Sequence, residues 1–303
     1  MRYAAVIIAG LLVATAGCGG GKPATTASGA AATAKPTATP AQLPGGGRVI
    51  FSKPRRRVVA FYGNPDDAEL GTLGIGPPAQ MAKRLKRVAK GYDRPHRPVL
   101  PAMELLASVA TSAPGADGKY RHRASNAMIG RYLRAARSVG AVLILDIQPG
   151  RAEFMPEARS LRRWLRKPDV SLALDPEWHV KAPGLPGQEI GSVDATDVLA
   201  VGRWLDDLTA RRNLPQKLFV VHQFTEGMVK RRDRLRPYRH LGFVLNVDGF
   251  GSQVVKSAKY RAFAKLVPFA FTGFKLFYKE DSGLMTPRQV LRLRPAPDMV
   301  VYE

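Results

Sequence analysis

The sequence predicts an α/β fold, a (β/α)₈ barrel, over residues 48–303. Three observations lead to this prediction. Short apolar runs alternate with longer amphipathic segments from residue 48 onward. Alternating strands and helices imply a parallel sheet, and about eight repeats within roughly 255 residues match the size of such a barrel. Polar residues also recur at the ends of most predicted strands, and a barrel gathers those ends into one ring. An open doubly wound sheet is the alternative.

The residues before the barrel are predicted to be an export signal and a tether. Arg2 is followed by the apolar segment 4–17, which at about 14 residues has the length of a signal peptide and is too short to cross a bilayer. Small residues directly precede Cys18, the only cysteine in the chain. This segment resembles the lipobox of bacterial lipoproteins, which implies that Cys18 becomes the lipidated first residue. A cleaved signal peptide that releases the protein is the alternative.

Residues 18–47 are rich in Gly, Ala, Thr and Pro and contain no acidic residue. Such a segment cannot bury enough apolar surface to offset its ordering entropy. We therefore predict a flexible linker that holds the domain off the extracytoplasmic face of the cell membrane.

The chain is strongly basic. It carries 47 Lys and Arg against 24 Asp and Glu, a formal net charge of +23. A field of this sign favours anionic partners such as lipid head groups, acidic wall polymers or nucleic acid. Export makes nucleic acid an unsuitable partner, so anionic envelope polymers are expected. Arginine-biased codon usage, with the positive residues coating solvated helices, is the other explanation.

The predicted strands are apolar runs that end in polar residues. The run 141–146 is continuously apolar, which indicates a strand buried on both faces of a parallel sheet. The predicted strands are, in chain order, 57–62, 98–109, 141–146, 170–174, 217–224, 240–247, 271–278 and 298–303.

The predicted helices lie between these strands. In the segment 126–138, apolar residues recur at 3.6 spacing, and Asp194 is a predicted N-cap. The predicted helices are 66–89 with a Gly-Pro-Pro interruption, 126–138, 153–166, 195–208, a short basic helix at 226–236, 252–266 and 287–293.

The strand 170–174 leads into two carboxylates, Asp175 and Glu177. Side chains alternate along a strand, so this spacing points both acids the same way. Pro176 has no N–H for a sheet, which places the pair at the strand end. Neighbouring carboxylates cannot both ionise freely, so one retains its proton and can serve in general acid/base chemistry. A strand-ending turn with two solvated acids is the alternative.

Glu177 is the predicted general acid. Asp175 is predicted to orient Glu177 or to raise its pKa, while Asp146 and Asp248 are predicted to position substrate or activate water. Polar and aromatic residues near the strand ends are predicted to bind substrate, although a buried histidine in such a place can also be structural. These candidates are Tyr62, Trp178, His222, Gln223 and Lys275.

The sequence Leu174-Asp175-Pro176-Glu177 resembles the Asp-x-Glu signature of family 18 chitinases and family 25 muramidases, barrel glycosidases that act on N-acetylated sugars. The resemblance implies that Glu177 is the acid and that Asp175 assists the acetamido group of the substrate. It covers only this motif and the predicted barrel. Ala173 stands where the chitinases have another Asp, and the first strand ends in Tyr62 where the muramidases have an acid.

No metal site and no cofactor are predicted. The five histidines lack ligand spacing such as His-x-x-x-His, and no Gly-x-Ser-x-Gly elbow is present. From the lipobox, the paired carboxylates and the Asp-x-Glu resemblance, we expect a membrane-anchored glycosidase that acts on peptidoglycan, another cell-wall glycan or another polysaccharide. The alternative is a barrel lipoprotein without catalysis that binds glycan or an envelope partner.

Overall fold

A computed structural model describes residues 17, 19–20, 39–65 and 67–303. The chain divides into two compact units, Met1–Thr39 and Pro40–Glu303, and every element below belongs to the second. Cys18 and most of the predicted signal and linker lie outside the described residues. No helix of the described segments is both long and apolar enough to cross a membrane.

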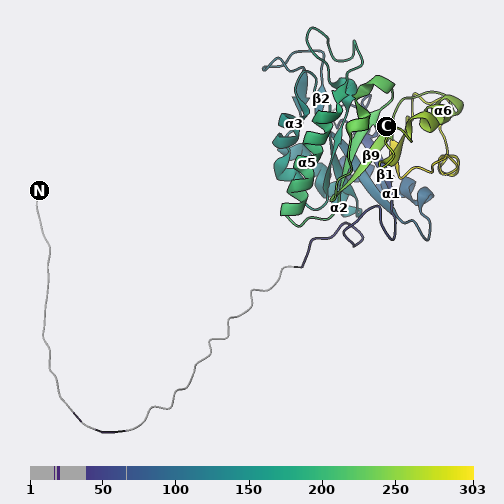
Figure 1. Ribbon diagram of the computed structural model, residues 1–303. Helices are drawn as coiled ribbons and strands as arrows, with labels where there is room; N and C mark the ends of the chain where they lie inside the picture. The colour runs from purple at the N-terminus through teal and green to yellow at the C-terminus, as the bar shows by residue number, and fades with distance from the viewer. Residues whose placement is uncertain (1–16, 18, 21–38, 66) are drawn as a thin grey trace, which may run out of the picture. The chain divides into compact units, whose positions relative to one another are not determined.

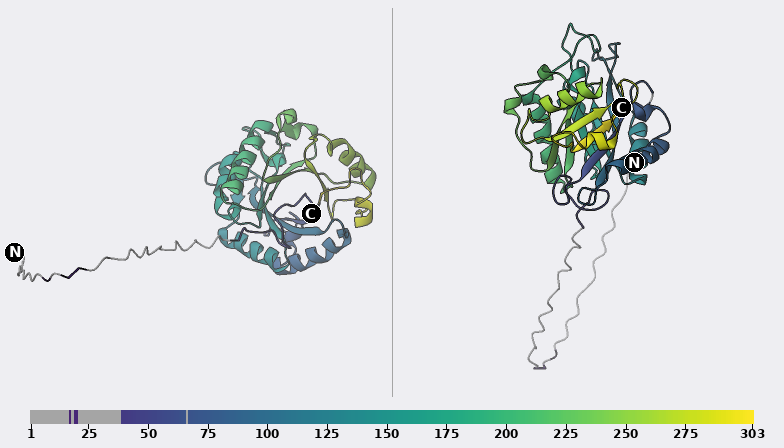
Figure 2. Two further views of the ribbon diagram at one scale, coloured as in Figure 1. Left: turned by 60° about the horizontal axis from the view of Figure 1, so that its bottom comes forward. Right: turned by 90° about the vertical axis from the view of Figure 1, so that its right-hand side faces the viewer.

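Eight parallel strands close into a barrel, as predicted. Each strand pairs with the next around the ring, and β1 pairs with both β2 and β11, which excludes an open sheet. In Figure 2 (left) the strands form an inner ring with helices outside it. The barrel strands are β1 (Arg57–Gly63), β2 (Val99–Ala110), β4 (Val142–Ile147), β5 (Val170–Leu174), β7 (Lys217–Gln223), β9 (Leu241–Val247), β10 (Phe271–Leu276) and β11 (Met299–Tyr302).

Helices connect most of these strands and cover the outside of the barrel (Figure 1). Four of them begin with side-chain caps, at Ser125, Asp194, Ser252 and Thr286, and the cap at Asp194 is the predicted one. The helices are α1 (Pro78–Ala89), α2 (Asn126–Ser138), α3 (Phe154–Ser160), α4 (Arg162–Leu165), α5 (Ala195–Arg211), α6 (Gln253–Phe263) and α7 (Pro287–Val290).

The predicted basic helix at 226–236 is wrong. The connection from β7 to β9 instead contains the 3₁₀ turns η4 (Glu226–Met228) and η5 (Arg232–Arg234) around the two-residue strand β8 (Val229–Lys230), which pairs with β6 (Val193–Asp194). Residues 230–234, between the buried Val229 and Leu235, are all charged, so the segment has no apolar residue at the i+3 or i+4 position that the stripe of an amphipathic helix needs.

Alternate residues of each strand belong to two separate cores. On β1, Val59 and Phe61 pack outward under the helices, whereas Val58, Ala60 and Tyr62 point into the barrel. This alternation determines which side chains reach the barrel interior.

The amino-terminal end of the barrel interior is filled by the segment that precedes β1. Leu43, Ile50 and Phe51 are buried within the inner core, and the Phe51 ring stacks on Phe271 with 4.0 Å between centroids. The compact unit includes residues 40–47, which belong to the predicted linker. The carboxyl-terminal end of the barrel holds the candidate site.

Candidate active site

Each of the eight barrel strands contributes a polar side chain to the carboxyl-terminal end of the barrel interior. The strand register places Tyr62 beside Glu104 and His222 beside Asn246. Because inward positions recur every second residue, these polar groups follow the apolar interior residues of the same strands. The eight residues are Tyr62, Glu104, Asp146, Asp175, His222, Asp248, Lys275 and Glu303.

A cavity of 380 Å³ opens at this end of the barrel. This volume is within the range of small-molecule sites, about 300–1,000 Å³. Five aromatic rings contribute to the wall: Tyr62, Trp178, Phe224, Phe250 and Phe277. The other lining residues are Leu70, Leu106, Gln148, Asp175, Glu177, Asp248, Gly249, Lys259, Lys275 and Glu303.

Six of the nine predicted catalytic and substrate-binding residues line the cavity: Tyr62, Asp175, Glu177, Trp178, Asp248 and Lys275. The other three do not reach its wall. Asp146, His222 and Gln223 are fully buried, because they lie one layer deeper in the barrel or beneath the β7 connection. His222 therefore influences the cavity only indirectly, through its hydrogen bond to the lining residue Asp248.

Glu177 reaches the cavity from a 3₁₀ turn, η3 (Pro176–Trp178), and not from a continued strand. β5 ends at Leu174, so strand alternation does not explain why Asp175 and Glu177 both line the cavity. The Gly191 N–H donates a 2.6 Å hydrogen bond to the Glu177 carbonyl oxygen. A side chain at Gly191 would collide with backbone oxygens of this turn, so only glycine permits this close approach.

The two acids of this turn both favour their protonated forms. Burial, with the negative charges of Asp175 and Asp248, raises the pKa of Glu177 to about 8. Burial also raises the pKa of Asp175 to about 7, against the opposing positive charge of His222. Among the described residues, Asp175 Oδ1 has no hydrogen-bond partner. Glu177 is thus mostly protonated at neutral pH and lines the cavity wall.

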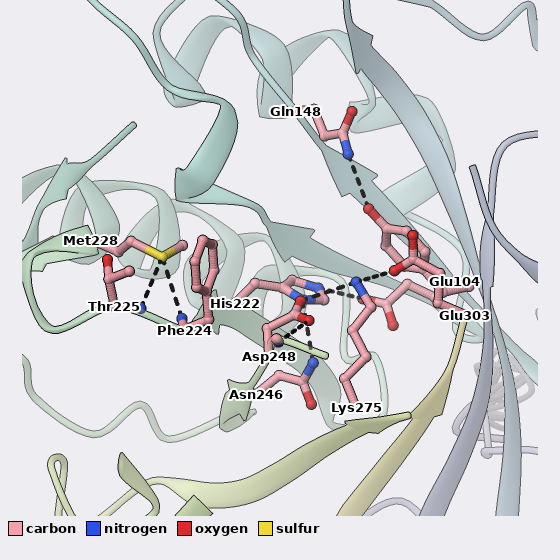
Figure 3. A network of polar contacts seen from close by, with 12 residues as sticks. Glu104, Gln148, His222, Phe224, Thr225, Met228, Asn246, Asp248, Lys275 and Glu303 are labelled. Carbon is pink, nitrogen blue, oxygen red and sulfur yellow. Dashed lines mark hydrogen bonds and ion pairs between the residues drawn. The ribbon is translucent and has the colours of Figure 1, made fainter. Parts of the chain in front are cut away.

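A buried charge network forms the floor of the cavity (Figure 3). Asp248 Oδ2 accepts hydrogen bonds from His222 Nδ1 at 3.0 Å and from Lys275 Nζ at 3.0 Å. Lys275 Nζ also lies 2.6 Å from Glu303 Oε2, and His222 Nε2 lies 3.1 Å from Glu104 Oε1. Two cationic side chains therefore alternate with three carboxylates.

This network keeps Asp248 ionised. Burial by itself would raise the pKa of Asp248, but Lys275 and His222 outweigh burial and hold that pKa well below its usual range. Burial likewise opposes the charged forms of His222 and Lys275, yet their carboxylate partners raise both pKa values well above the ordinary ones. One cavity thus contains a protonated acid, Glu177, and an ionised carboxylate, Asp248, a division that acid/base enzymes use.

A second buried ion pair fixes one side of the cavity. Lys256 Nζ lies 2.9 Å from Asp281 Oδ1, and Lys256 also donates to the Gly249 carbonyl oxygen. Asp281 accepts hydrogen bonds from the Gly251 and Phe277 N–H groups. The loops after β9 and β10 are therefore joined to each other.

Sequence reasoning missed Glu104, Gln148 and Glu303. Gln148 Nε2 donates to the Tyr62 hydroxyl at 3.1 Å, and its Oε1 accepts from the Ala110 N–H. A signal was present for Glu303, which lies two positions after the inward-facing Val301. The same signal was present for Gln148, which lies two positions after the inward-facing Asp146, and for Glu104, which lies two positions after the inward-facing Ala102.

Within the described part of the chain, no group of three or more His, Cys, Asp or Glu residues is arranged to hold a metal ion. No protein-family model matches the chain, and no curated protein is similar in sequence. Among solved structures, a crystal structure of D-psicose 3-epimerase in the presence of D-fructose is similar over 82% of this chain and 84% of that one, with 10% identity and a TM-score of 0.38.

Proposed function

We propose that this protein is a glycoside hydrolase in which Glu177 is the general acid. One observation carries the proposal: a carboxyl group with its pKa raised to about 8 and an ionised carboxylate, Asp248, line the same aromatic cavity. Most glycosidases use two carboxyl groups, one protonated and one ionised. The predicted Asp-x-Glu resemblance supports the same role for Glu177.

The cavity wall supports carbohydrate as the ligand. Aromatic rings such as those of Trp178 and Phe250 offer flat apolar faces, on which the C–H faces of a sugar ring can pack. The Tyr62 hydroxyl and the side chains of Asp175 and Gln148 offer polar groups for sugar hydroxyl or acetamido groups. Such a wall of apolar surface with few polar groups is typical of small-ligand sites.

In the proposed reaction, Glu177 donates its proton to the glycosidic oxygen as the bond to the anomeric carbon breaks. The ionised Asp248 stabilises the positive charge that develops on the sugar. Asp175, whose Oδ1 has no partner in the described chain, holds the acetamido group of the substrate. Water then adds to the anomeric carbon and gives a proton to the Glu177 carboxylate, which restores the acid.

Incubation of the fragment 40–303, which is one compact unit, with peptidoglycan and a panel of polysaccharides tests the proposal. We expect new reducing ends from at least one of these polymers. Saturable binding without release of reducing ends from any of them would instead favour the non-catalytic glycan-binding barrel.

The activity is expected to fall as pH rises through about 8, because Glu177 must be protonated to donate and its pKa is raised to about 8. Initial rates at subsaturating substrate between pH 5 and 10 measure this limb of the profile. A rate that is constant up to pH 10 would contradict Glu177 as the acid.

We also propose that a lipid at Cys18 anchors the protein to the extracytoplasmic face of the cell membrane. Cys18→Ala is expected to move the protein from the membrane fraction to the soluble fraction or the medium, because no acyl chain can then be attached. Thr37→Ala, a change within the linker, is the control and is expected to leave the protein with the membrane. Membrane retention of Cys18→Ala would exclude the anchor.

A further inference from the structure

Lys259 is a cation on the cavity wall that forms no ion pair with any described acidic residue. It belongs to α6, is half-buried and lines the cavity. The Lys259 Nζ lies 5.3 Å from the centroid of the Phe224 ring, a cation–π distance. Within the described residues, no carboxylate lies within ion-pair distance of this ammonium group, whereas Lys256, Lys275 and Lys279 all have one.

The loop after β9 leaves room for this ammonium group. Gly249 has a φ of +99°, which disfavours any other residue, and a Cβ at this position would lie 2.7 Å from Lys259 Nζ. The ammonium group is therefore held between the Gly249 backbone and the Phe224 ring, both of which line the cavity. The contacts with Gly249 and Phe224 hold the Lys259 ammonium group at the cavity wall.

The other charges of the cavity leave Lys259 without a counter-ion. Lys275 is matched by Asp248 and Glu303 at 3.0 and 2.6 Å. Glu177, whose pKa is raised to about 8, is mostly protonated at neutral pH and so contributes little negative charge there. Of the two lysines that line the cavity, Lys259 is the one that forms no ion pair with a described carboxylate, so an anionic group of a ligand can pair with it directly.

We propose that Lys259 binds a negatively charged substituent of the substrate, so that the cavity selects acidic glycans over neutral ones. This inference rests on the proposed function, because it names the substrate class of the same cavity. The shared chemistry is an anionic group on a sugar: the carboxylate of a uronic acid, the lactyl carboxylate of muramic acid, or a phosphate. The net charge of +23 favours the approach of such polymers.

Binding measurements on the full chain with Glu177→Gln test the inference separately from turnover. Isothermal titration compares oligogalacturonate with its neutral methyl ester, a muramic-acid-containing disaccharide with its lactyl methyl ester, and a glycerol phosphate oligomer with glycerol. We expect at least one anionic probe to bind roughly tenfold or more tightly than its neutral counterpart, since a charge-assisted hydrogen bond contributes to its affinity. The probe that binds identifies the source of the charge.

Adding Lys259→Met to the Glu177→Gln chain is expected to remove the preference for the anionic probe. Lys259→Arg in its place is expected to keep part of that preference. Lys279→Met, the same substitution at a half-exposed lysine that does not line the cavity, is expected to leave the preference unchanged. Equal binding of the anionic and neutral probes, or an unchanged preference in Lys259→Met, would overturn the inference.

The two proposals fail in different ways. Hydrolysis of neutral glycans at a rate unaffected by Lys259→Met would retain the glycosidase and reject the acidic substrate. Anion-selective binding through Lys259 without hydrolysis of any acidic polymer would retain the subsite and reject the glycosidase.

Discussion

Glu177→Gln is expected to lower kcat by about 10²- to 10⁴-fold, the usual contribution of a general acid. Glutamine keeps the shape of the side chain but has no proton of comparable acidity to donate to the glycosidic oxygen. Steady-state rates on the best substrate of the polysaccharide panel measure the loss. Glu189→Gln, the same change at an exposed position of the neighbouring loop, is the matched control and is expected to retain wild-type turnover.

Stability distinguishes this loss from unfolding. The pKa of Glu177 is raised in the folded protein, so its contribution to stability is present below the unfolded pKa of about 4.5 and is lost as pH rises through about 8. Removing the titrating group should therefore make Glu177→Gln at least as stable as the wild type at pH 8. Full activity in the variant would remove Glu177 from the mechanism.

Lys275→Met is expected to destabilise the fold by about 3–5 kcal/mol at pH 8, because it leaves the buried carboxylates of Asp248 and Glu303 without their shared cation. Without Lys275 the pKa values of both carboxyl groups rise, so protonation at lower pH offsets part of the loss. The free energy of unfolding, measured by urea denaturation, should thus differ less from wild type at pH 5 than at pH 8.

The matched control for this variant is Lys279→Met. Its side chain is 50% exposed and its partner Glu69 is 79% exposed, so removing this pair should change the free energy of unfolding by about 1 kcal/mol or less. If the two variants lose equal stability, or if the deficit of Lys275→Met does not depend on pH, the Lys275 network does not stabilise the fold as described.

The strands were predictable because their apolar runs are long and end in polar residues. The predicted strand at 170–174 matches β5, and the predicted helix at 126–138 matches α2. The 226–236 segment was mistaken for a helix because its charge density resembles a solvated helix face, although it lacks an apolar stripe. The charged run 230–234 between Val229 and Leu235 was the sequence signal against a helix.

The candidate site was predictable only in part. Strand-end position identified Asp175, Glu177 and Asp248, but it gave no depth, so Asp146 and His222 were ranked with residues that line the cavity. Depth depends on the stagger of neighbouring strands, which no local pattern encodes. Lys259 could not be predicted as a site residue because it lies on a helix and not at a strand end. It reaches the cavity only because Gly249 leaves room for it.

The segment around Leu43, Ile50 and Phe51 closes the amino-terminal end of a packed barrel interior, and the cavity opens at the opposite, carboxyl-terminal end. Substrate must enter and product must leave through the same opening, so a long polymer cannot be threaded through the barrel. A chain end can insert, or an internal stretch can bend across the opening.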